Sequence, residues 1–153
     1  MNAGDVDKAC KSNVGGLGTR VLSLETRHES FETGIIDIMI QSYKDLDVYQ
    51  DASELFPQVY QEVRSWDYID QKELGSQMIR AANSVHANLA EGYCKSTKNF
   101  KRYILEAVGS VNEMESHLVD AHNVDLIDDD TYNGLSSAYE IVGKQLTNLR
   151  KSL

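Results

Sequence analysis

Four cationic side chains are concentrated in one short stretch of the sequence, YCKSTKNFKRY, and no acidic residue follows them before Glu106. The cations are Lys95, Lys98, Lys101 and Arg102. Aromatic residues alternate with them, at Tyr93, Phe100 and Tyr103. Because cations neutralise phosphates and aromatic rings stack on unpaired bases, the stretch predicts contact with RNA. The alternative is a solvated basic loop, since Phe100 and Tyr103 also fit the apolar stripe of a helix.

Two stripes of polar residues flank this basic stretch. The spacing of three and four residues puts each stripe on one side of a helix. The first stripe comprises Gln77, Arg80, Ser84, Asn88 and Glu91, and the second comprises Glu106, Ser110, Glu113 and His117. Arg80 is positioned to pair with Glu106 or Glu113, so we expect a structural polar layer, buried or between subunits, that fixes helix register. A groove for a ligand or partner is the alternative.

The sequence predicts neither catalysis nor a bound cofactor. No nucleophile stands with a base and an orienting group, so no catalytic residue is expected. Di-iron bundles need Glu-x-x-His motifs on two helices, whereas the only such spacing here is Glu25 with His28. The glycine-rich GGLG at residues 15–18 lacks the strand, helix and lysine of a phosphate loop. We therefore predict a non-enzyme without metal or cofactor.

The overall charge favours a different kind of partner. The chain carries a formal net charge of -9, which opposes the basic footprint usual for a nucleic-acid-binding domain. Local patches can nevertheless bind where the average charge repels. The alternative function is therefore a protein interaction module whose acidic surface contacts a basic partner, with no role in nucleic-acid binding.

The sequence also predicts the cellular compartment and the absence of a membrane span. No run of 18 apolar residues is present, so no membrane span is expected, and the first residues do not read as a secretory signal. Cys10 and Cys94 have no metal or redox spacing, which favours free thiols in a cytoplasmic protein over a disulfide between them.

The helical pattern begins only after residue 42. Residues 1–42 are predicted to be an N-terminal extension, disordered or with one short helix, although residues 20–42 packed on the bundle are an alternative. Residues 43–153 then contain four amphipathic segments. The first covers about 45–65 and contains Pro57, which predicts a kink or a break into two short helices.

Capping signals delimit the other three segments. Asp70 with Glu73 resembles a capping box, and Gly92 suits the end of the second helix. Ser96 or Thr97 can cap the third helix, which runs to about Asn123, and the acids at 128–130 suit the start of the fourth. Short connections predict an all-α, antiparallel up-and-down four-helix bundle whose first helix is kinked at Pro57.

Two of these segments also resemble a known family. The second helix reads QMIRAANSVHANLAEGY, and the third carries Ala107, Gly109, Ser110 and Glu113 in order. Over roughly residues 43–152 the chain resembles the 23S-rRNA-intervening-sequence protein family, also called the four-helix-bundle protein family. The resemblance implies a cytoplasmic bacterial protein that assembles into a homopentamer. A related group, the accessory proteins of diversity-generating retroelements, binds nucleic acid through a basic surface.

The combined hypothesis is a non-enzymatic scaffold that contacts RNA or a ribonucleoprotein. In a pentamer the basic stretch would be repeated around a ring, so weak contacts would add through avidity. The rival hypotheses are the protein interaction module and a small-molecule or metal pocket within the polar layer.

Overall fold

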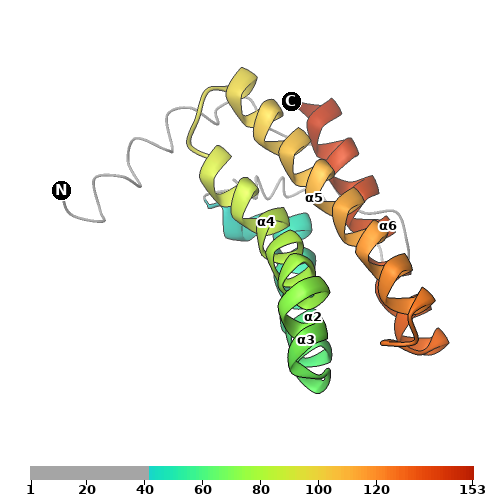
Figure 1. The fold of residues 1–153 in the computed structure, drawn as a ribbon. Coiled ribbons are helices and arrows are strands. Elements are labelled where there is room, and N and C mark those ends of the chain that lie inside the picture. The colour runs from blue at the N-terminus through green and yellow to red at the C-terminus, as the bar shows by residue number, and fades with distance from the viewer. Residues whose placement is uncertain (1–41) are drawn as a thin grey trace.

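The described part of the chain forms four long helices connected by short loops. The computed structural model describes residues 42–153, so the predictions for the N-terminal extension lie outside the described residues. Figure 1 shows α2, α4, α5 and α6 running alternately down and up, with short turns between them. The predicted all-α four-helix bundle is confirmed.

The first long helix, α2 (Asp47–Ser65), follows a single 3-10 turn at Tyr43–Asp45. Ser42 caps that turn, and the Asp45 carboxylate accepts a hydrogen bond from the Ser42 N–H at 2.8 Å. Pro57 lies inside α2, which continues through it as one helix. The alternative of two short helices is therefore wrong. Pro57 is exposed, and water can replace a backbone bond that is lost on the outer side of a helix.

The second helical run begins earlier than predicted. It comprises α3 (Tyr68–Asp70), the π-helical turn η2 (Gln71–Gly75) and α4 (Ser76–Gly92). The cap is Asp67, whose carboxylate accepts hydrogen bonds from the N–H groups of Ile69 at 2.9 Å and Asp70 at 3.1 Å. The predicted start at Asp70 is therefore wrong.

The π-helical turn coincides with a close approach between α4 and α2. Gly75 is buried there, and a Cβ built on it would overlap the Val63 side chain of α2. A residue without a side chain thus lets the two helices meet at this turn. Nothing in the hydrophobic periodicity predicts the wider turn.

The last two helices have the predicted caps. In α5 (Thr97–Asn123) the Ser96 hydroxyl accepts a hydrogen bond from the Asn99 N–H at 3.4 Å. In α6 (Asp129–Ser152) the Asp128 carboxylate accepts one from the Thr131 N–H at 2.8 Å. The hydrogen bonds from Thr131 lower the pKa of the Asp128 carboxyl. Both helix starts are confirmed.

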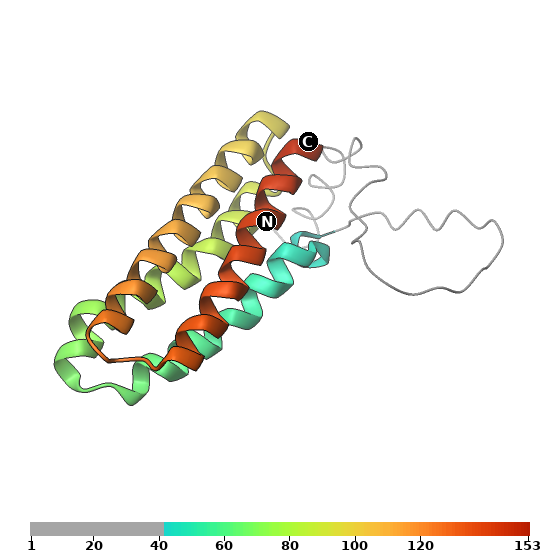
Figure 2. The same ribbon diagram turned by 90° about the vertical axis from the view of Figure 1, so that its right-hand side faces the viewer.

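Each helix packs against two neighbours. α2 lies against α4 and α6, and α5 also lies against α4 and α6 (Figure 2). α2 and α5 are therefore diagonal to each other in the bundle, as are α4 and α6. The apolar stripes of all four helices meet along the centre. The side chains with the least exposure there are Val59, Met78, Ala82, Val85, Leu89, Ile104, Ala107, Met114, Leu118, Ala121, Tyr139 and Leu146.

The buried face of α2 is made mainly of aliphatic side chains. Val48 and Leu55 are buried, whereas Tyr60 is 40% exposed. Tyr49 and Phe56 lie at the edge of the core, where each ring meets the His86 imidazole edge-on at 5.9 Å between centroids. On α2, aliphatic residues thus face the centre of the bundle, whereas Tyr49 and Phe56 lie at its rim.

Tyr139 carries a buried polar group that lacks a partner. Its side chain is fully buried, its hydroxyl has no hydrogen-bond partner, and burial raises its pKa well above the ordinary value. We expect Tyr139→Phe to stabilise the protein by about 1 kcal/mol, because it removes an unsatisfied hydroxyl without changing the ring. Thermal unfolding followed by circular dichroism measures the effect. A lower melting temperature would mean that the hydroxyl is satisfied in solution.

Candidate nucleic-acid interface

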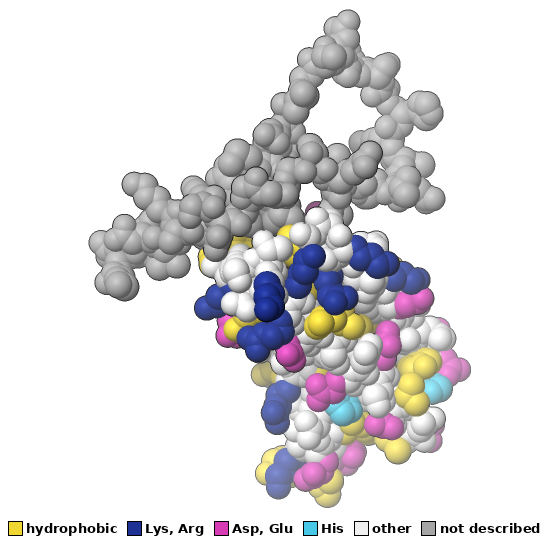
Figure 3. Space-filling view, turned by 90° about the horizontal axis from the view of Figure 1, so that it is seen from above, with side chains coloured by type: hydrophobic (Ala, Val, Ile, Leu, Met, Phe, Trp, Pro, Cys, Tyr) yellow, Lys and Arg dark blue, Asp and Glu magenta, His cyan; other side chains and the backbone are white. Residues whose placement is uncertain are grey.

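The predicted cations lie together at one end of the bundle. Lys95 is in the α4–α5 connection, and the other three are on the first two turns of α5. Lys95, Lys98 and Arg102 are exposed and Lys101 is half-buried. Viewed along the bundle from this end, the Lys and Arg side chains gather on the near surface (Figure 3). We call this surface the basic end.

The structure adds cations that the sequence reading did not place there. Arg150, in the last turn of α6, shares a shallow pocket with Lys98, Lys101 and Arg102 of α5. Lys44 also belongs to this end, since the adjacent Tyr43 ring contacts Tyr93, which caps α4, at 6.3 Å between centroids. Arg150 could have been predicted at this end from the antiparallel pairing of α5 and α6, which brings the end of α6 beside the start of α5.

The aromatic residues among the cations belong to the core. Tyr93 and Phe100 are both 2% exposed, and their rings pack edge-on at 6.0 Å between centroids. Neither ring is available to stack on a base. The prediction that the interleaved aromatic residues take part in RNA stacking is therefore wrong for these two.

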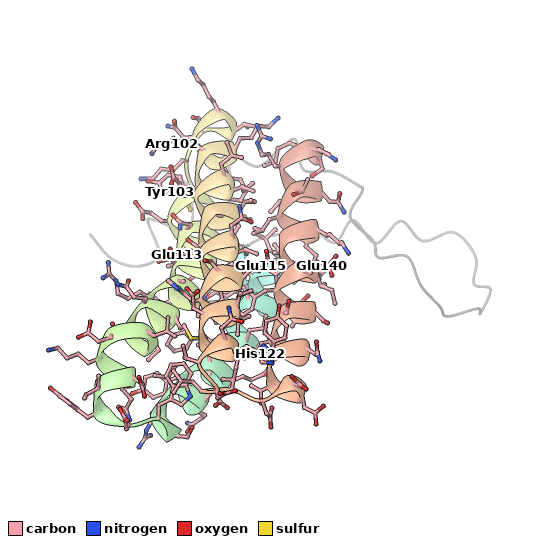
Figure 4. The ribbon with its side chains drawn as sticks, turned by 45° about the vertical axis from the view of Figure 1, so that its right-hand side comes forward. Arg102, Tyr103, Glu113, Glu115, His122 and Glu140 are labelled. Atoms are coloured by element: carbon pink, nitrogen blue, oxygen red, sulfur yellow. The ribbon has the colours of Figure 1, made fainter. Side chains whose placement is uncertain are left out.

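Tyr103 is half-buried, and both its hydroxyl and its ring contact charged side chains. Its hydroxyl donates a hydrogen bond to the Glu91 carboxylate of α4 at 2.8 Å, and this bond is the main reason that its pKa is raised. The Arg102 guanidinium lies 5.1 Å from the centre of its ring. Figure 4 shows Arg102 and Tyr103 next to each other near the start of α5. Tyr103 thus helps to hold Arg102 and joins α5 to α4.

The two polar stripes lie mostly on the surface of the protomer. Gln77, Arg80, Glu91, Glu106 and Glu113 are exposed, Ser84 and Asn88 are half-buried, and Ser110 is buried. Glu91 of the first stripe accepts a hydrogen bond from Tyr103, which precedes the second stripe on α5. The stripes therefore do not form a polar layer buried inside one protomer, because most of their side chains are exposed.

Apart from the bond from Tyr103 to Glu91, the hydrogen bonds of the stripes stay within single helices. The Asn88 amide donates to the Ser84 carbonyl at 2.8 Å, and the Ser110 hydroxyl donates to the Glu106 carbonyl at 3.1 Å. Glu113 lies 3.7 Å from His117 on the same helix. Among residues 42–153 no ion pair joins Arg80 to Glu106 or Glu113, so the expected pairing within one chain is absent. A layer between subunits stays a prediction.

Residues 42–153 contain no group of three or more His, Cys, Asp or Glu side chains able to hold a metal ion. Within that range, none of the helices has the length and apolar character required to cross a bilayer. Cys94, expected as a free thiol, is disulfide-bonded, so that expectation is wrong for this residue, while Cys10 lies outside the described residues.

The geometry thus defines a class of protein: an antiparallel four-helix bundle with a basic end built from α5 and α6. A comparison with family profiles matches residues 44–148 to the 23S rRNA-intervening sequence protein family. The chain belongs to this family, which confirms the resemblance seen in its second and third helices.

A solved structure supports the fold independently. The crystal structure of a protein of unknown function from the S23 ribosomal protein family of Bacteroides thetaiotaomicron VPI-5482 superposes with a TM-score of 0.63 at 19% identity. The match covers 71% of this chain and 98% of that one. The search of curated proteins found no match.

Proposed function

We propose that this protein is a non-enzymatic, self-assembling scaffold whose basic end contacts RNA or a ribonucleoprotein. The observation that carries the proposal is the convergence of Lys98, Lys101 and Arg102 of α5 with Arg150 of α6 in one pocket. Cations gathered at one end of an acidic chain give that end a local positive potential that can attract an anion. The family names, which refer to rRNA and to a ribosomal protein, support RNA as that anion.

Self-assembly is supported by the outer face of α5. One stripe along this helix is exposed and carries no charge: Leu105, Gly109, Asn112, Ser116 and Val119. Leu105 is 47% and Val119 43% exposed, and a Cβ added at Gly109 would meet no atom within 4 Å. A small, uncharged stripe on a highly charged protein suits close contact with another copy. We propose that copies pack along this face, as the homopentamer implied by the family requires.

Leu105→Glu and Gly109→Leu test this assembly. Each change places a charge or a bulky side chain on the α5 stripe without touching the protomer core, so we expect a folded monomer in place of the oligomer. Light scattering after gel filtration measures the mass, which should be about five protomer masses for the natural protein. A monomeric natural protein, or an unchanged oligomer in both variants, would contradict the proposal.

RNA contact is tested by titrating the purified protein with structured and with single-stranded RNA across a salt series. If each of the four cations contacts its own phosphate, the slope of log affinity against log salt is about -3, since each contact to a single strand contributes about -0.7, and a shallower slope follows if they converge on one phosphate. Binding that does not weaken with salt would contradict an interface made of cations. Absence of binding even at low salt would sink the RNA proposal as a whole.

A second candidate function rests on the opposite end of the bundle. Acidic side chains cluster where α2 meets α3 and where α5 meets α6: Asp67, Asp70, Asp125, Asp128, Asp129 and Asp130. Next to them Tyr68 is 77% and Ile69 is 68% exposed. Acids around two exposed apolar side chains suit a basic protein partner. Binding of such a partner that Ile69→Asp abolishes, in a protein that does not bind RNA, would favour this function.

A further inference from the structure

We propose that the pocket between the start of α5 and the end of α6 binds the terminal phosphate monoester of an RNA strand. The proposal rests on the RNA contact proposed above, and it names the chemical group that this contact recognises.

The pocket is lined by cations from two helices. Lys98, Lys101 and Arg102 occupy one side of α5 at spacings of three and four residues, and Arg150 faces them from α6. Thr97 and Leu105 complete the lining, so no acidic side chain is part of it. Two arginines approaching from different helices can each donate two parallel hydrogen bonds to one phosphate group.

The charges in the pocket are not neutralised within the protomer. None of the three ion pairs of the described residues involves a pocket residue. The positive end of the α5 dipole lies at the same place, because Thr97 is the first residue of that helix. Like charges that converge without a partner repel one another, and a bound anion relieves this repulsion.

The number of cations distinguishes a terminal phosphate from an internal one. An internal phosphodiester carries a single negative charge, whereas a phosphate monoester carries about -1.5 to -2 near neutral pH. Four cations around one pocket match the more highly charged group better. No aromatic side chain lines the pocket, so it offers no ring for base stacking and favours recognition of the end over recognition of the sequence.

The test compares two oligoribonucleotides of one sequence, one with a 5′-phosphate and one with a 5′-hydroxyl, each labelled at its 3′ end. Fluorescence anisotropy should show about 10-fold tighter binding of the phosphorylated strand, the gain expected from added charge-assisted hydrogen bonds. Arg150→Gln should remove this preference. Arg64→Gln should keep it, because Arg64 is also an exposed arginine in the last turn of a helix but lies at the other end of the bundle.

Each of the other possible results contradicts a different part of the proposal. Equal affinity for both strands, or a preference that survives Arg150→Gln, would overturn the terminal-phosphate assignment and leave RNA contact standing. Inorganic phosphate that competes at the same concentration as the phosphorylated strand would replace the RNA end by a free phosphate ligand. If neither strand binds, both the assignment and the proposed function fail. Circular dichroism verifies that the two variants are folded.

Discussion

Replacing Lys95, Lys98, Lys101 and Arg102 with glutamate is expected to abolish RNA binding and to leave the bundle folded. Binding to phosphates depends on the cations that displace counterions, so reversing four of them should weaken affinity at least about a hundred-fold at low salt. The fold should persist because three of the four side chains are exposed. Acids near the start of α5 also interact favourably with the helix dipole. The salt series described above, repeated with this variant, measures the loss.

A second variant with four substitutions distinguishes the effect of the basic end on RNA binding from the effect of net charge. Arg64, Lys72, Arg80 and Lys144 are exposed and belong neither to the basic stretch nor to the pocket lining, so their replacement with glutamate changes the net charge of the protein by the same amount. This control should bind RNA far better than the first variant. Equal loss in both variants would mean that overall charge governs binding. Undiminished binding by the first variant would leave the basic end as a solvated connector.

Gly92→Ala is expected to lower the free energy of unfolding by about 3 kcal/mol. A cost of this size is typical when an extra methyl group is forced into a packed core. Gly92 is buried at the end of α4, where that helix lies against the first turns of α5. A Cβ added there would lie 2.5 Å from the Tyr103 Cβ and 3.0 Å from the Phe100 Cδ2. The Tyr103 Cβ is fixed to the α5 backbone, so the two helices must separate to admit the methyl group.

Gly134→Ala provides the matched control. Gly134 is an exposed residue inside α6, and a Cβ added to it meets no atom within 4 Å. The same substitution should therefore stabilise the protein by about 0.5 to 1 kcal/mol, because alanine is favoured over glycine in a helix. Urea unfolding curves of the two variants compare the effects. Changes of the same sign at both sites would contradict the close approach of α4 and α5.

The sequence predicted those features of the fold that depend on local spacing. Ser96 and Asp128 each accept a bond from a residue three positions later, so the starts of α5 and α6 follow from a local pattern. The start of the second run was predicted wrongly because Asp67 and Asp70 are both acceptable caps. With Asp67 as the cap, helical structure also includes Tyr68 and Ile69. Both side chains are largely exposed, so they do not belong to the buried apolar stripe of the helix.

Features that depend on contact between helices were not predictable in the same way. The π-helical turn at Gly75 reflects the approach of Val63 from α2, which no periodicity within the second helix records. Arg150 reaches the basic end only because α6 lies antiparallel to α5. The aromatic residues near the cations were ambiguous between core and surface, and packing placed Tyr93 and Phe100 in the core.

The separation of charge between the two ends gives the protomer a permanent electric dipole moment along its long axis. Asp128, Asp129 and Asp130 lie at one end and Arg102 and Arg150 at the other. In the field of a polyanion such a particle experiences a torque as well as a force, so it turns its basic end forward during diffusion. The encounter rate should therefore fall as ionic strength shortens the range of that field, and the orientation of the bundle on its target is selected before the surfaces touch.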